Sequence, residues 1–341
     1  MPQRKLILHI GWHKTGTTAI QAFLRQNREL LESQCGVYYP RSGQGGSAHH
    51  VLAHAQIHSK PERQALWGQL SHELRTNLDW RVALISSEAF SNGTLQQIQS
   101  IKEALTGDWA IQILSYLRPP DEALEARFAE RVKRSECRES WREFLASQGP
   151  LPYKSISRMW QSAFGADAVI VRPYDRRQWS GGELLIDFFE ALGLGEALQT
   201  EGLVYPGRVN VSPDAEMLAV LREVSSRLHL QGFAVDPVIF KKYLCTQVQD
   251  SFAATNRRRP QAKFFTAVQR KELRNSYREE LADLGLRFDE AEVGNSDPGA
   301  VDLPEFQSMD PMERSEILIA MLLETTKELS ISQGRRIGRI E

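Results

Sequence analysis

A glycine-rich segment near the amino terminus, residues 11–18 with the sequence G-W-H-K-T-G-T-T, combines the residue types that hold a phosphate group. It follows a short apolar stretch and precedes a segment whose apolar residues have helical spacing. A glycine-rich turn that enters a helix presents backbone N–H groups and the positive end of the helix dipole to an anion. Threonine hydroxyls add donors, and Lys14 adds a positive charge. We therefore predict a phosphate-binding loop here.

The position of the lysine distinguishes this loop from that of the nucleoside triphosphatases. In the pattern G-x-x-x-x-G-K-[ST] the lysine follows the second glycine, whereas here Thr17 takes that place and Lys14 lies inside the loop. Triphosphate chemistry also needs Mg²⁺ and an acidic metal ligand, and no such aspartate is obvious in the sequence. A P-loop kinase or NTPase is therefore one alternative, and a non-catalytic nucleotide-binding protein of the same fold is another.

The run H-K-T-G-T-T after a first strand resembles the 5′-phosphosulfate loop of the sulfotransferases that use 3′-phosphoadenosine 5′-phosphosulfate (PAPS), especially the bacterial members. The resemblance implies that loop residues hold the donor, namely His13, Lys14, Thr15, Gly16, Thr17 and Thr18. It also implies that Lys14 stabilises the charge that grows on the leaving phosphate oxygen. The expected co-substrate is PAPS, the expected product is adenosine 3′,5′-bisphosphate, and no metal is expected.

The segment 114–126, L-S-Y-L-R-P-P-D-E-A-L-E-A, resembles the family's 3′-phosphate segment. Arg118 matches the arginine that ends a strand there, and the resemblance implies that it binds the 3′-phosphate. Ala126 stands where the family has a serine, so one hydrogen bond is missing or supplied elsewhere. Arg127 or Arg131, four residues apart on one helix face, is a candidate to supply the charge, and a solvated basic face is the alternative.

Two side chains are candidates for the base that removes the proton of an acceptor hydroxyl. Glu88 follows a predicted strand, and ligands of open α/β sheets lie beyond the carboxyl ends of strands. Carbohydrate sulfotransferases often use a glutamate, so the resemblance makes Glu88 the first candidate; orienting Lys14 or the acceptor, and capping a helix, are its alternatives. His50 is the second candidate. Its spacing with His54 and His58 would also suit a metal, but no cysteine or paired carboxylate accompanies them.

The resemblance extends over about residues 5–215 and leaves the acceptor open. Arg208, in a family-like turn before a predicted helix, is expected to approach the 3′-phosphate or the acceptor. Bacterial relatives suggest a carbohydrate or glycolipid hydroxyl as the acceptor. A sugar, a lipid and a small phenol are not distinguished by the sequence.

The elements that must position these residues alternate along the chain. Apolar stretches predict buried parallel strands at 5–10, 81–86, 110–117 and 168–172. Apolar residues at helical spacing predict helices at 50–58, 61–77, 94–105 and 182–192, and later at 214–229, 266–284 and 311–329. The pattern predicts an α/β, three-layer, P-loop-like fold with a central parallel sheet flanked by helices, plus a helical C-terminal region. We expect a PAPS-binding core at 1–212 and a helical extension at 213–341 that completes the acceptor site or an oligomer interface.

The composition is that of an ordinary globular protein. The chain has 341 residues, of which 41% are hydrophobic and 25% charged, and its net charge of −1 gives no general attraction to nucleic acid or anionic membranes. Its three cysteines are far apart and suggest neither a zinc site nor a disulfide framework. No apolar run approaches the roughly 20 residues that a membrane span needs. We expect a cytoplasmic protein with a small-molecule or carbohydrate acceptor; a homo-oligomer is left open.

Overall fold

The structure is a computed structural model of the chain, and it describes residues 3–54, 60–77, 79–207, 215–230, 237, 240–241 and 263–288. Internal contacts divide the chain into two units. The first unit comprises residues 1–120, 151–210 and 273–290, and the second comprises residues 121–150, 211–272 and 291–341. The expected division at residue 212, between a PAPS-binding α/β core and a helical extension, stays a prediction.

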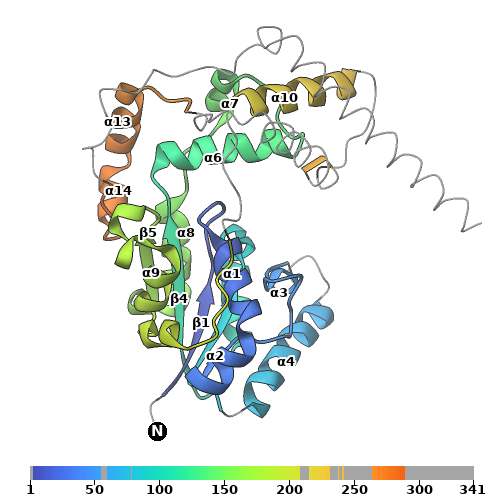
Figure 1. Cartoon of the computed structure of the whole chain (residues 1–341), viewed down its shortest axis with the longest axis vertical. Coiled ribbons are helices and arrows are strands. Elements are labelled where there is room, and N and C mark those ends of the chain that lie inside the picture. Colours follow the sequence, from blue (N-terminus) through green and yellow to red (C-terminus); the bar gives the residue numbers. More distant parts are fainter. Residues whose placement is uncertain are drawn as a thin grey trace, which may run out of the picture. The chain divides into compact units, whose positions relative to one another are not determined.

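A five-stranded parallel sheet forms the centre of the first unit, with the strand order β2-β3-β1-β4-β5. Figure 1 labels three of these strands, β1, β4 and β5. The strands are β1 (Arg4–His9), β2 (Val37–Tyr38), β3 (Val82–Ser86), β4 (Trp109–Leu117) and β5 (Val169–Pro173). Four of them match predicted strands, and β2 has only two residues, too few for a hydrophobic pattern to predict it. Because all strands are parallel, their carboxyl ends lie at one edge of the sheet.

Strand β1 shows why this sequence forms a buried strand. Leu6 and Leu8 face one hydrophobic core, and Ile7 between them faces the other. All three side chains are fully buried. A strand that is apolar on both faces is stable only in a sheet covered on both sides, so the sequence of β1 already requires two layers of helices.

Helices supply both layers. One face is covered by α1 (Thr17–Gln26), α2 (Arg28–Cys35) and α9 (Leu184–Ala191), and the other by α3 (His50–Ala53), α4 (Lys60–Thr76), α5 (Leu95–Ala104) and α8 (Tyr153–Phe164). In α1 the apolar stripe of Ile20, Phe23 and Leu24 is fully buried against the sheet. The predicted three-layer α/β fold with a central parallel sheet is confirmed.

The chain leaves the neighbouring strands β1 and β4 in opposite directions. After β1 it runs through α1 and α2 to β2 at one edge of the sheet, and after β4 it continues to β5 at the other edge. In open α/β sheets, ligands bind beyond the carboxyl ends of strands at such a divergence. The topology therefore places the expected ligand site beyond His9 and Leu117.

The described part of the second unit is helical. It contains most of α6 (Pro120–Lys133), α7 (Trp141–Ser147), α10 (Ala215–Leu230) and the first part of α13 (Ala267–Ser276). The ring of Phe128 on α6 is fully buried and packs edge-on against Trp141 and Phe264, with centroids 5.3 and 5.1 Å away. Arg270 on α13 bonds the buried carboxylates of Asp121 and Glu125 on α6.

The predicted helices differ from the observed ones mainly at their ends. The single helix expected at 266–284 is two helices, α13 and α14 (Arg278–Ala282), separated at Tyr277. Helix α3 ends at Ala53, and the helix expected at 311–329 lies outside the described residues. Within the described ranges, every helix is too short or too polar to span a lipid bilayer.

Candidate functional site

The loop between β1 and α1 is built on three left-handed residues. Gly11, Lys14 and Gly16 have φ values of 65°, 66° and 72°. Gly16 is the N-cap residue of α1 and gives it no side-chain cap. The first N–H groups of a helix have no partner inside the helix, so α1 opens with donors and the positive end of its dipole at the carboxyl edge of the sheet. This is the geometry of an anion site.

Both glycines are required by close packing as well as by conformation. A Cβ atom on Gly11 would lie 2.7 Å from Cβ of Glu88, and one on Gly16 would lie 2.2 Å from Cδ2 of Leu184. Distances under about 3 Å are repulsive, so any side chain at either position would displace a neighbour. Gly11 thus brings the loop directly against Glu88, beyond the ends of β1 and β3.

The threonines of the loop have different roles. The Thr15 hydroxyl is buried and donates to the carbonyl oxygen of Trp12 at 2.6 Å, while the N–H of Trp12 donates back to it at 3.3 Å. That hydroxyl closes the loop on itself, so its proton is not the ligand donor expected from the sequence. Thr17 is buried and Thr18 is exposed. Thr18 is therefore the loop threonine most accessible to a ligand.

Lys14 occupies a backbone conformation that few residues other than glycine adopt. Its side chain is half-buried, and its φ of 66° belongs to the left-handed region, which costs an L-residue roughly 1–2 kcal/mol. Such strain gathers at functional sites, where the surrounding structure holds it in place. Lys14 is thus strained at the residue where the sequence predicts the catalytic charge.

Glu88 begins a 3₁₀ helix, Glu88–Asn92, directly after β3. Its Oε2 accepts a hydrogen bond from Gln21 Nε2 at 3.1 Å, and its Oε1 lies 3.9 Å from His50 Nε2. Burial by itself raises the pKa of Glu88, but hydrogen bonds from its own backbone N–H and from Gln21, and the charges of His50 and His13, outweigh burial and lower the pKa below the usual value. Glu88 is therefore a carboxylate near neutral pH.

His50 is held beside Glu88 by its neighbours. Its Nδ1 lies 2.8 Å from the hydroxyl of Ser87, at hydrogen-bonding distance. The preceding residue, His49, is fully buried; its backbone N–H donates to the carbonyl oxygen of Ser86, and its Nδ1 accepts from the N–H of Ser86. Burial lowers the pKa of His49 to about 4, so His49 is a neutral anchor. The structure thus brings both predicted base candidates, Glu88 and His50, together.

A series of buried hydrogen-bonded side chains continues from Glu88, and no sequence motif predicts it. Gln21 Nε2 also donates to Oγ of Ser86 at 3.2 Å, and that hydroxyl lies 2.8 Å from His9 Nδ1. Burial lowers the pKa of His9 to about 4, with Glu88 opposing the shift, so His9 is neutral. These side chains come from β1, α1 and β3, and only the fold shows that they meet.

Arg118 follows β4, and its guanidinium lies over the ring of Tyr174, 4.7 Å from the ring centroid. Its carbonyl oxygen accepts a hydrogen bond from the Tyr153 hydroxyl at 2.8 Å. Its Nε is buried and has no hydrogen-bond partner among the described residues. A buried donor without an acceptor is rare and unfavourable. The ring of Tyr174 thus orients the Arg118 guanidinium, and a ligand oxygen could accept the hydrogen bond from its Nε.

The remaining predicted residues lie elsewhere or have their own partners. His13 is exposed, and its Nε2 accepts from Nδ2 of Asn92 at 3.1 Å. Arg127 and Arg131 belong to the second unit, where Arg127 donates to Gln148 Oε1 and Arg131 to the carbonyl oxygen of Glu136. Arg208 lies outside the described residues. Binding of the donor by these residues stays a prediction.

Comparisons with known proteins show two distant similarities. No family model matches the chain. It is 31% identical over 147 residues to an uncharacterized protein of Archaeoglobus fulgidus, an alignment that covers 43% of this chain and 39% of the relative, so the chain matches about two fifths of that protein's length. It is similar to a sulfotransferase from Alicyclobacillus acidocaldarius of known crystal structure, with 16% identity and a TM-score of 0.39 over 68% of this chain and 97% of the other. A score of that size supports no conclusion about function.

Proposed function

We propose that the chain is a PAPS-dependent sulfotransferase that transfers a sulfuryl group to an acceptor hydroxyl. The observation that carries the proposal is the loop of residues 11–16, in which a strained lysine stands between two left-handed glycines at the uncapped N-terminus of α1. Lys14 and the first N–H groups of α1 together supply the positive potential that a phosphosulfate needs. A lysine inside the loop, rather than after its second glycine, is the sequence feature that separates this arrangement from a triphosphate site.

The residues at the carboxyl edge of the sheet fit a nucleotide with two separate anionic groups. The loop suits the 5′ group, and the buried, unpartnered Nε of Arg118 suits a 3′-phosphate. Tyr174, against which Arg118 lies, keeps the guanidinium in one orientation. When bound, PAPS supplies an activated sulfuryl group.

The transfer requires one bond to form and one to break. The acceptor oxygen bonds to sulfur, the bond between sulfur and the 5′-phosphate oxygen breaks, and the acceptor proton leaves to a base. Lys14 stabilises the negative charge that grows on the phosphate oxygen. Glu88 is the preferred base, because it is ionised near neutral pH and lies against Gly11 of the loop. His50, at 3.9 Å from Glu88, orients that carboxylate or takes the proton in its place.

Ligand binding tests this proposal directly. Isothermal titration calorimetry compares adenosine 3′,5′-bisphosphate, AMP and ATP with Mg²⁺ on the wild type, on Arg118→Gln and on the control Arg158→Gln, which changes an arginine of α8 that is 66% exposed. We expect the bisphosphate to bind the wild type and the control about 10–100-fold more tightly than AMP, since a charge-assisted hydrogen bond contributes ~1.5–3 kcal/mol. The preference should disappear in Arg118→Gln.

Two results would contradict the proposal. One is that AMP and the bisphosphate bind the wild type equally well. The other is that Mg²⁺-dependent ATP binding exceeds both, which would favour a kinase or NTPase. Transfer of labelled sulfate from PAPS to a panel of sugar and glycolipid acceptors then separates an enzyme from a non-catalytic nucleotide-binding protein.

A further inference from the structure

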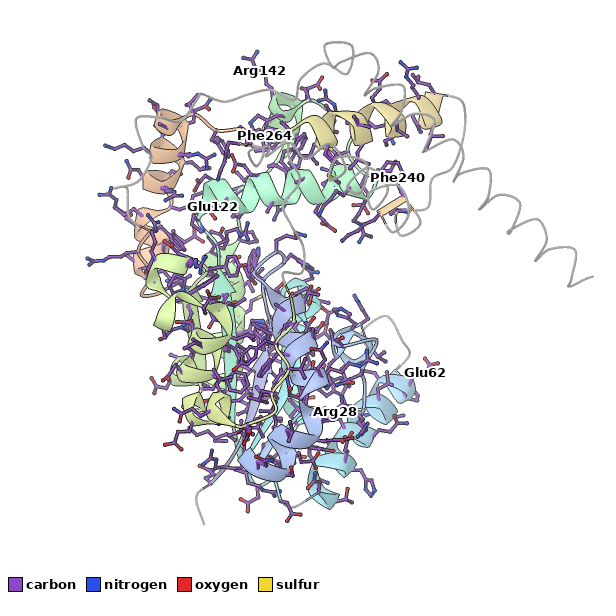
Figure 2. The ribbon with its side chains drawn as sticks, in the orientation of Figure 1. Arg28, Glu62, Glu122, Arg142, Phe240 and Phe264 are labelled. Atoms are coloured by element: carbon purple, nitrogen blue, oxygen red, sulfur yellow. The ribbon has the colours of Figure 1, made fainter. Side chains whose placement is uncertain are left out.

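Three arginines surround Tyr39, near the end of β2. They are Arg25 in the last turn of α1, Arg28 at the start of α2 (labelled in Figure 2) and Arg41 in the loop after β2. The Arg28 guanidinium lies over the Tyr39 ring, 5.6 Å from its centroid. Burial, with the charge of Arg41, lowers the pKa of Arg28. Arg28 and Arg41 are therefore close enough to repel each other.

This cluster, which we call the Tyr39 arginine cluster, has no carboxylate partner. Among the described residues, none of the three arginines has an acidic oxygen within 4.0 Å. The nearby carboxylate of Glu73 is used otherwise: it accepts hydrogen bonds from the Tyr38 hydroxyl at 2.6 Å and from the backbone N–H groups of Arg41 and Ser42. Glu73 therefore balances part of the positive charge of Arg28 without a hydrogen bond to any of the three arginine side chains, and a basic cluster without a bonded carboxylate favours an anionic ligand.

Two buried donors in the cluster lack acceptors. Arg28 is only 9% exposed, and its Nη2 donates to Oε1 of Gln44 at 2.7 Å. The Nε of Arg28 and the Nε2 of Gln44 are both buried and have no hydrogen-bond partner within the described part of the chain. A buried donor without an acceptor is unfavourable, and here two such donors belong to side chains in direct contact. An anionic oxygen at this point would satisfy them.

The loop that carries Gln44 leads directly to the base candidates. A Cβ atom on Gly45, the next residue, would lie 3.8 Å from Cβ of His50. The Tyr39 hydroxyl donates to the carbonyl oxygen of Ser47 at 2.6 Å, which fixes the loop over the cluster. Glu88 also influences the pKa of Tyr39. The loop of residues 44–50 thus joins the cluster to the pair Glu88–His50.

We infer that Arg28, Arg41 and Gln44 form an acceptor subsite for an anionic group, so that the acceptor is an acidic sugar bearing a carboxylate or a sulfate ester. The inference rests on the proposed function, because it takes Glu88 or His50 as the place where the acceptor hydroxyl reacts. An acidic group held by the cluster would orient the sugar toward that pair. A neutral sugar would leave the buried donors unsatisfied and should bind more weakly.

Charged and neutral versions of one sugar test the subsite. The probes are methyl β-D-glucuronide, its uncharged methyl ester, and methyl glucoside 6-sulfate, each titrated into protein saturated with adenosine 3′,5′-bisphosphate so that the phosphate loop is occupied. We expect at least about tenfold tighter binding of an acid probe than of the ester, the size of one charge-assisted hydrogen bond. Whether the carboxylate or the sulfate binds better identifies the acidic group.

Variants locate the binding. Arg28→Lys keeps the charge but loses the planar fork of donors, and Arg41→Gln changes an exposed side chain that the fold tolerates. Both should reduce binding of the acid probe about tenfold, while the control Arg158→Gln leaves it unchanged. Equal binding of acid and ester, no binding of either, or insensitivity to both variants would overturn the inference.

The first titration, of the bisphosphate alone, reports on the proposed function separately. If the bisphosphate binds but the acid probe shows no preference, the subsite is wrong and the sulfotransferase proposal stands. If the bisphosphate does not bind, the sulfotransferase proposal is contradicted, and the inferred acceptor with it.

Discussion

Arg270 in the second unit and Arg118 in the first unit are used in opposite ways. In the second unit Arg270 bonds both Asp121 and Glu125, and Lys241 and Lys133 both contact Glu130. At the carboxyl edge of the sheet in the first unit, the buried Nε of Arg118 instead has no acceptor in the ranges that the structure describes. A paired charge stabilises the fold, whereas an unpaired one is unfavourable until a ligand arrives. The difference indicates which cations are structural and which are available for binding.

Backbone strain sharpens the same contrast. Among the described residues other than glycine, Lys14 and Ser135 have positive φ, one in each unit. Ser135 ends α6 in a turn, where its hydroxyl lies 2.5 Å from that of Ser225. Lys14 lies within the predicted phosphate loop, between Gly11 and Gly16. The backbone strain at Ser135 therefore accompanies a turn between helices, whereas the strain at Lys14 occurs at the predicted catalytic residue.

The largest expected effect is a loss of stability when a paired charge is removed. Arg270→Met removes the partner of two carboxylates that are at most 7% exposed, and breaking a buried ion pair costs about 3–5 kcal/mol. Urea denaturation should show that loss in the free energy of unfolding, and hydrogen exchange should place it in residues 121–150. The control Arg134→Met breaks the exposed pair with Glu136 and should cost less than about 1 kcal/mol. Similar losses in both variants would remove the distinction between paired and available charges.

The next effect is on catalysis rather than stability. Lys14→Ala should lower kcat for sulfate transfer about 10²–10³-fold, the usual result of removing one electrostatic stabiliser of a transition state. Its thermal midpoint should not fall. Lys5→Ala, at the amino end of β1 and exposed, serves as the matched control and should keep full activity. Retention of wild-type kcat by Lys14→Ala would end the proposed role of the lysine.

The sequence predicts this fold well because the signals are local. The apolar run in β1, the apolar stripe of α1 and the glycines at 11 and 16 each act over a few residues, and the structure forms a strand, a helix and a left-handed turn there. Local patterns also explain the errors: β2 is too short to have a pattern, and a single polar turn at Tyr277 divides a predicted helix.

The site is predicted less completely, because its contacts join distant segments. The positions of Lys14, Glu88 and Arg118 follow from strand ends in a parallel sheet. The hydrogen bond from Gln21 to Glu88 spans 67 positions in sequence, and nothing in either segment indicates it. The Thr15 hydroxyl turns inward for a similar reason, since its orientation depends on the turn at Trp12. Packing, rather than residue type, determines which atoms these side chains contact.

A smaller effect concerns pH. Because folding lowers the pKa of Glu88, its ionised form stabilises the fold above the ordinary glutamate value, and that contribution is lost as the pH falls through the lowered pKa. If Glu88 is the base, kcat/KM falls on the acid side only below about pH 4.3, the ordinary pKa of glutamate. In Glu88→Gln this fall in kcat/KM should be absent. An acid limb that persists in Glu88→Gln and disappears in His50→Gln would assign the proton to His50 instead.

The smallest expected effect tests the strain itself. Lys14→Gly and Lys14→Ala both remove the lysine side chain and differ only in the Cβ atom, which is unfavourable at the φ of 66°. The glycine variant should therefore be more stable than the alanine variant by about 1 kcal/mol. At Gln99, an exposed position inside α5, the order should reverse by about 1 kcal/mol, since glycine is the poorer helix former. Denaturant midpoints of the four variants measure both differences, and an alanine variant as stable as the glycine variant at position 14 would show that the loop relaxes and stores no strain at its lysine.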